Sequence, residues 1–130
     1  MTCAQPDSRK AAGRAAESYA AQLLQARGYR LAAANVRPLP GLARGEIDLI
    51  AWDGEILCFV EVKARRGGRL TPDTSVTIAK QRQIIRLAEA YLSNCGFEPP
   101  SCRFDVVSVW LNPELPTPML SLMQDAFGVE

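Results

Sequence analysis

The stretch GEIDLIAWDGEILCFVEVKAR, residues 45–65, predicts two neighbouring β-strands that carry charge where a buried strand normally has none. Its apolar segments, 46–53 and 55–65, meet at Asp53-Gly54, a dipeptide typical of tight hairpin turns. Four charged side chains interrupt these segments: Glu46, Asp48, Glu61 and Lys63. Burying an unpaired carboxylate costs several kcal/mol, about the net stability of a small domain. The pattern therefore indicates either a functional site or an ion-paired patch.

The rest of the chain predicts a single α/β domain spanning residues 1–130. The first eight residues are expected to form a flexible tail. Helical periodicity occurs at 8–27 and 77–94, and strand patterns occur at 29–38, 103–111 and 119–124. The expected order is α-β-β-β-α-β-β, with helices on both sides of a mixed sheet.

The composition excludes several classes of site. The chain has no histidine, which excludes Ser-His-Asp and Cys-His catalysis and histidine-bound zinc. Its four cysteines form no CxxC pair, so neither a zinc ribbon nor a thioredoxin-type site is predicted. We find neither a membrane span nor a secretory signal, so a cytoplasmic protein is expected. If the protein is an enzyme, its acid–base chemistry must come from carboxylates, lysine or a bound metal ion.

Basic side chains are concentrated in one segment, although the net charge is only +1. Residues 61–86 carry seven basic and two acidic side chains, whereas residues 87–130 carry one basic and six acidic ones. Such a cluster can attract a polyanion to a nearly neutral protein. A solvated helix face and loop would give the same pattern, and charge alone favours that simpler interpretation.

Strand periodicity places the charged residues on shared faces. Glu46 lies on the face of Asp48, and Lys63 on that of Glu61. If the DG dipeptide is the two-residue turn, Asp48 pairs with position 59, and Glu61 is its diagonal neighbour about 7–8 Å away at Cα. Two carboxylates so placed can bind one Mg²⁺ or Mn²⁺, hard cations that prefer oxygen ligands. The structural alternative is a patch in which Lys63 neutralises Glu61 or Asp48.

Three further residues receive interpretations from the pattern. Glu46 is either an outer ligand of the same ion or the polar start of a strand, and the sequence favours neither. Arg103 and Asp105, in the segment RFDVV, are expected to form a structural ion pair with each other or with the first helix, and not to act in catalysis.

Two motifs resemble known families. Asp48, twelve intervening residues and then Glu61-Val62-Lys63 resemble the D…(D/E)xK motif of the PD-(D/E)XK nuclease superfamily. The blocks GRAAESYAAQLLQARGY, GEIDLIA, FVEVKAR and RFDVV resemble, in order, the YraN-like family of uncharacterised bacterial proteins, which are related in sequence to archaeal Holliday-junction resolvases. The resemblance implies a restriction-endonuclease-like core.

The resemblance also implies a catalytic set that works with Mg²⁺ or Mn²⁺. Its expected members are Glu17, Asp48, Glu61, Lys63 and Gln81. Asp48 and Glu61 would bind the metal ion, and Lys63 would be the catalytic lysine. Glu17 would add a carboxylate from the first helix. Lys80 is the alternative to Gln81 as the polar residue of the second helix.

The expected function is therefore a metal-dependent endonuclease acting on DNA phosphodiester bonds, at branched or damaged DNA. Phosphate contacts are expected from Arg65, Arg66, Arg69, Lys80 and Arg82. The alternative is a catalytically inactive module that keeps the nuclease fold and binds nucleic acid or acts as a scaffold. RNA as the substrate and association into a homodimer are left open by the sequence.

Overall fold

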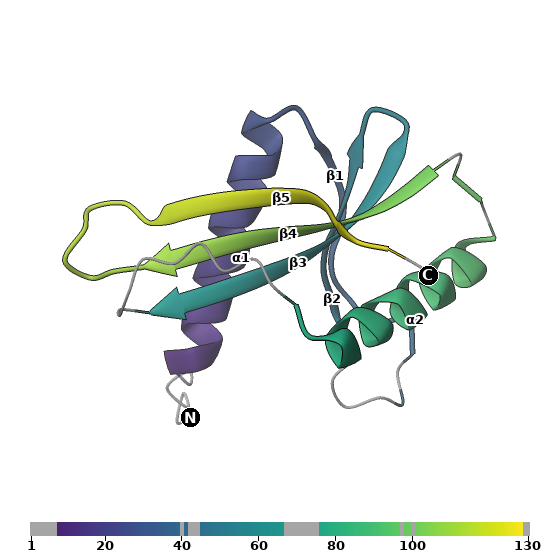
Figure 1. Cartoon of the computed structure of the whole chain (residues 1–130), viewed down its shortest axis with the longest axis horizontal. Helices are drawn as coiled ribbons and strands as arrows, with labels where there is room; N and C mark the ends of the chain where they lie inside the picture. Colours follow the sequence, from purple (N-terminus) through teal and green to yellow (C-terminus); the bar gives the residue numbers. More distant parts are fainter. Residues whose placement is uncertain are drawn as a thin grey trace, which may run out of the picture.

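A five-stranded mixed sheet forms the centre of the molecule in the computed structural model (Figure 1). Its strands lie side by side in chain order: β1 (Arg30–Val36), β2 (Ile47–Asp53), β3 (Ile56–Arg66), β4 (Ser101–Leu111) and β5 (Met119–Phe127). β3 and β4 are parallel, and the other neighbouring pairs are antiparallel. The expected element order and mixed sheet are confirmed.

The structure describes residues 8–39, 41, 45–66, 76–96, 98–99 and 101–128. The tail expected at residues 1–8 lies outside this part of the chain, apart from Ser8, which begins the first helix.

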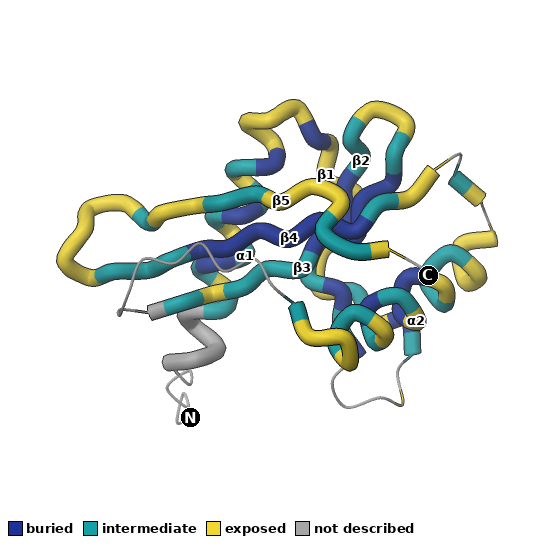
Figure 2. Tube along the Cα trace, viewed as in Figure 1, coloured by how far each residue is buried: buried dark blue, intermediate teal, exposed yellow. Residues whose placement is uncertain are grey.

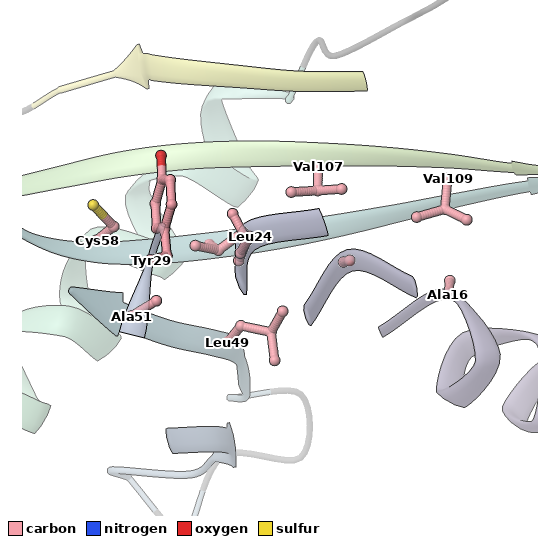
Figure 3. Close-up of a cluster of buried hydrophobic side chains, with 10 residues drawn as sticks. Ala16, Leu24, Tyr29, Leu49, Ala51, Cys58, Val107 and Val109 are labelled. Atoms are coloured by element: carbon pink, nitrogen blue, oxygen red, sulfur yellow. The ribbon is translucent and has the colours of Figure 1, made fainter. Parts of the chain in front are cut away.

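Two helices, α1 (Ser8–Ala26) and α2 (Ile78–Cys95), cover opposite faces of the sheet. Alternating residues of β3 show this, because Cys58 and Val60 pack in one apolar cluster whereas Leu57 and Phe59 pack in the other. α1 contributes Ala16, Ala20 and Leu24 to the first cluster (Figure 3), and α2 contributes Ile84, Leu87 and Ala88 to the second. Neither of these described helices has the length and apolar character needed to cross a membrane.

The β2–β3 hairpin turns one residue later than the sequence predicts. Gly54 and Glu55 form the turn, and Asp53 pairs with Ile56. Gly54 has φ of 62°, a left-handed conformation that glycine adopts without strain. The predicted turn placed this glycine second of the two central residues, whereas the structure places it first, an arrangement that glycine also favours.

α2 begins and ends close to the expected residues. Thr77 is the N-cap, and its Oγ1 accepts a hydrogen bond from the backbone N–H of Lys80 at 3.2 Å. Gly96 ends the helix in the left-handed conformation. Ile78, the first residue of the helix, is 65% exposed. Helical spacing aligns Ile78 with Ile85 on the flank of α2 and not with the buried stripe.

Asp105 is a fully buried carboxylate with several hydrogen-bond donors. Arg103 Nε donates to its Oδ1 at 2.8 Å, and the Tyr29 hydroxyl donates to its Oδ2 at 2.9 Å. The backbone N–H of Asp125, across an irregularity between β4 and β5, donates to Oδ1 at 2.9 Å. Arg103 also pairs with Asp53 at 2.9 Å. The expected structural ion pair between Arg103 and Asp105 is confirmed.

Asp105→Asn should lower the free energy of unfolding by about 3 kcal/mol, because it leaves Arg103 without its buried counter-charge and weakens the acceptor for three donors. Urea unfolding followed by circular dichroism measures this. The matched control is Asp125→Asn, which changes an exposed carboxylate in the same network region and should stay within about 0.5 kcal/mol of the wild type. Equal effects of the two changes would contradict a structural role for Asp105.

Candidate metal centre

The charged residues of β2 and β3 lie where these two strands separate. The last backbone pair between them is Leu49 with Val60. Beyond that pair β2 and β3 diverge from each other in Figure 1. We call the place where residues 45–48 separate from residues 61–66 the fork. The side chain of Asp48 bridges it, because its Oδ2 accepts a hydrogen bond from the backbone N–H of Val62 at 2.8 Å. This bond fixes the position of the carboxylate.

The observed register corrects the expected pairing of Asp48 with position 59. Phe59 pairs with Ile50 instead. Continued by one step past the last backbone pair, the register places Asp48 opposite Glu61. The two carboxylates therefore lie across the fork from each other and not on a diagonal, and their charges interact strongly.

Three carboxylates from two elements meet in the fork. Glu17 comes from α1, Asp48 lies at the beginning of β2, and Glu46 directly precedes that strand. One oxygen of each lies within 4.8 Å of the others, and all three residues are half-buried. We call these residues the acid cluster. A compact set of carboxylate oxygens is the donor type that Mg²⁺ and Mn²⁺ prefer, so the acid cluster is chemically suited to hold such an ion.

Glu61 lies beside the acid cluster and contacts α2. Its Oε1 is 3.8 Å from Nζ of Lys80. Lys63, two residues along β3, also lowers the pKa of Glu61 through its positive charge, although burial is the larger effect and raises that pKa overall. The structure thus brings together four of the five expected catalytic residues with Lys80: Glu17, Asp48, Glu61 and Lys63.

Burial and the crowding of like charges make the Asp48 carboxyl a weaker acid than usual. Burial is the largest cause and, with the negative charges of Glu61 and Glu17, raises the pKa of Asp48 to about 8. The N–H of Val62 and the charge of Lys80 act in the opposite direction. A cation placed among these carboxylates would remove the repulsion, so the crowding is consistent with a site built for positive charge.

Gln81 has a different environment from the one expected. Its Nε2 donates to the backbone carbonyl of Val76 at 2.8 Å, and its side chain lines a groove along α2. Of the two alternatives on this helix, Lys80 is therefore the one that contacts a site carboxylate.

The expected phosphate-binding residues are distributed over two elements. Arg65 is half-buried on β3, and Arg82 is exposed on α2. The side chain of Arg66 and the whole of Arg69 lie outside the described residues.

Asn35 is a site residue that the sequence reasoning missed. Its Nδ2 donates to Oε2 of Glu17 at 2.8 Å, which orients that carboxylate. Asn35 lies on β1 with φ of 52°, a conformation that asparagine tolerates better than most residues. An asparagine in an alanine-rich strand pattern, where this residue type is disfavoured, was the available signal.

The metal-free protein should lose stability as the pH rises from 5 to 8.5. The folded protein keeps a proton on Asp48 up to pH about 8, whereas the unfolded chain releases it near pH 3.8, so the folded state binds more protons in between. Asp48→Asn removes this titration, and its melting temperature in EDTA should exceed that of the wild type by several degrees at pH 8.5. Thermal melts at three pH values check this, and parallel profiles for the two proteins would contradict it.

Comparisons with known proteins identify the family. The family model described as uncharacterised protein family UPF0102 matches residues 16–109. A UPF0102 protein of Symbiobacterium thermophilum is 56% identical over 103 residues, covering 78% of this chain and 84% of that protein. A UPF0102 protein of Chlorobium chlorochromatii is 44% identical over 130 residues, covering 96% of this chain and 97% of that protein. The family resemblance inferred from the sequence blocks is confirmed: the chain belongs to the UPF0102 family.

Proposed function

We propose that the protein is a metal-dependent nuclease of the PD-(D/E)XK type that hydrolyses phosphodiester bonds in DNA, at branched or damaged sites. The observation that carries this proposal is the meeting, in one fork of the sheet, of the acid cluster with Glu61 and two lysines. The order of elements and the five-stranded mixed sheet support a restriction-endonuclease-like core.

The acid cluster would hold Mg²⁺ or Mn²⁺, with Glu61 as a neighbouring ligand. A bound divalent ion supplies positive charge to the phosphate and makes water a better nucleophile. Asn35 keeps Glu17 oriented toward that position, and Val62 does the same for Asp48. These two hydrogen bonds preorganise the carboxylates before an ion arrives.

The two lysines supply the positive charge of the chain itself. Lys63 lies on the face of Glu61 and would orient water or donate to a phosphate oxygen as negative charge develops there. Lys80 lies in the first turn of α2, where the helix N-terminus also favours an anion. A phosphate at the fork would therefore have acidic residues on one side and cationic groups on the other.

Two observations favour the alternative of an inactive nucleic-acid-binding module. Lys80 lies 3.8 Å from Glu61, and Asp48 with a pKa of about 8 is largely protonated at neutral pH. Both features compete with metal binding. Measured metal affinity separates the two functions, because only the nuclease requires occupancy of the acid cluster.

Asp48→Asn and Glu46→Gln should each weaken Mn²⁺ binding at least about tenfold, because each replaces a charged oxygen donor with a neutral amide. Isothermal titration calorimetry at pH 8 measures the affinity. Glu55→Gln, at the exposed tip of the same hairpin, is the matched control and should bind Mn²⁺ like the wild type. If the wild type does not bind Mn²⁺, the proposed nuclease is wrong and the binding module remains.

Lys63→Met should retain Mn²⁺ binding and lose cleavage by about 10²–10³-fold, since its charge acts on water and on the phosphate and not as a metal ligand. Cleavage is measured with Mn²⁺ on linear, nicked, flapped and four-way DNA. Loss of metal binding in this variant would assign Lys63 to the ion-paired patch instead.

A further inference from the structure

A groove of about 990 Å³ lies between α2 and the end of β5. Figure 1 shows the C-terminal end of β5 leading toward α2, and Figure 2 shows exposed positions along this helix. Its lining includes Ile78, Arg82, Ile85 and Arg86 on α2 and Phe127 on β5. The roles assigned above to the fork do not involve this part of the surface.

The groove has a positive wall. Arg82 and Arg86 are exposed and four residues apart, which places them one above the other on α2 with about 5–6 Å between their Cβ atoms. Within the described part of the chain, neither guanidinium forms a hydrogen bond or an ion pair. Glu89 is the acidic residue of the lining, so the two arginines leave an excess of positive charge. The wall is suited to successive phosphates of one strand.

The floor of the groove is apolar and includes an aromatic ring. Ile78 is 65% exposed, and Ile85 and Phe127 are half-buried. Phe127 stacks on Phe104, with ring centroids 5.0 Å apart and planes inclined by 19°. Phe104 is itself buried, so the ring that lines the groove rests on a rigid support. An aromatic platform beside arginines is the arrangement by which proteins bind unpaired bases and their phosphates.

The groove begins next to the proposed nuclease site. Gln81 lines the groove, and its neighbour Lys80 contacts Glu61 in the fork. From Ile78 to Glu89 the lining extends along α2 for about 16 Å at 1.5 Å per residue, enough for a few nucleotides of an extended strand.

We propose that this groove binds a single-stranded segment of nucleic acid, with Arg82 and Arg86 on phosphates and Phe127 against a base. The inference deepens the proposed function and rests on it for the position of the adjoining cleavage site. A duplex would keep its bases stacked and away from Phe127, and an acidic peptide would not use the aromatic platform. The preferred substrate is then DNA with a single-stranded region beside the scissile bond.

The test measures binding of a 5′-labelled twelve-nucleotide deoxyribonucleotide by fluorescence anisotropy in EDTA, which separates binding from metal and from cleavage. Arg82→Ala with Arg86→Ala should weaken binding about tenfold or more and reduce the log–log salt slope by about one to two units. Phe127→Leu should weaken binding about five- to tenfold through lost stacking, whereas Phe127→Tyr keeps an aromatic ring and should bind like the wild type. Arg27→Ala with Arg30→Ala removes two exposed arginines, one from the turn after α1 and one from β1, and is the matched control.

The proposal would be overturned if the groove double variant and the control bound the oligonucleotide with equal affinity. Weak binding by Phe127→Tyr would also overturn it, because the affinity lost in Phe127→Leu would then have a structural cause. A glutamate-rich peptide that binds as tightly as the oligonucleotide and competes with it would assign the groove to a protein partner. Strand binding in EDTA without any Mn²⁺ binding would keep the groove and refute the nuclease, whereas Mn²⁺-dependent cleavage unaffected by the groove variants would refute the groove alone.

Discussion

The hydrogen bond from the backbone N–H of Val62 to Asp48 is the interaction on which the site depends. β2 and β3 stop pairing after Leu49 and Val60, and a backbone donor would be left unsatisfied there. The Asp48 carboxylate accepts this hydrogen bond at 2.8 Å and so allows the sheet to open. Because the sheet is open, residues from helices on opposite faces reach the same place: Glu17 from α1 and Lys80 from α2. An ordinary closed sheet would have kept them apart.

Two acids in this molecule, the fully buried Asp105 and the half-buried Asp48, show how a neutralised carboxylate differs from a crowded one. Asp105 is fully buried and is neutralised by Arg103, with further donors from Tyr29 and a backbone N–H. Asp48 has one backbone donor and is surrounded by other carboxylates, so its pKa rises to about 8. A fold under selection for stability alone would favour the first arrangement. The second arrangement is typical of functional sites, which is why Asp48 marks the candidate site.

Local sequence signals predicted the elements well, and the contacts between elements poorly. The ends of α2 lie close to the predicted ones, because the caps Thr77 and Gly96 depend only on nearby residues. The hairpin register was missed because a DG dipeptide fits either of two turn placements, and only packing of β2 on β3 decides between them. The acid cluster was anticipated in part, since strand alternation links Glu46 to Asp48. Asn35 could not be assigned, because its contact with Glu17 joins residues from two elements whose relative position the sequence does not specify.

The geometry of α2 divides one basic segment of sequence between two surfaces. Lys80 contacts Glu61, whereas Arg82 and Arg86, two and six residues later, line the groove beside Phe127. Because a helix turns by about 100° per residue, neighbouring cationic residues must point in different directions. The segment that the sequence groups as one phosphate-binding cluster therefore places Lys80 against the acidic site, and Arg82 and Arg86 along the groove. In the proposed nuclease, affinity for a strand and chemistry at the fork would then depend on different residues of the same helix, and either could change without the other.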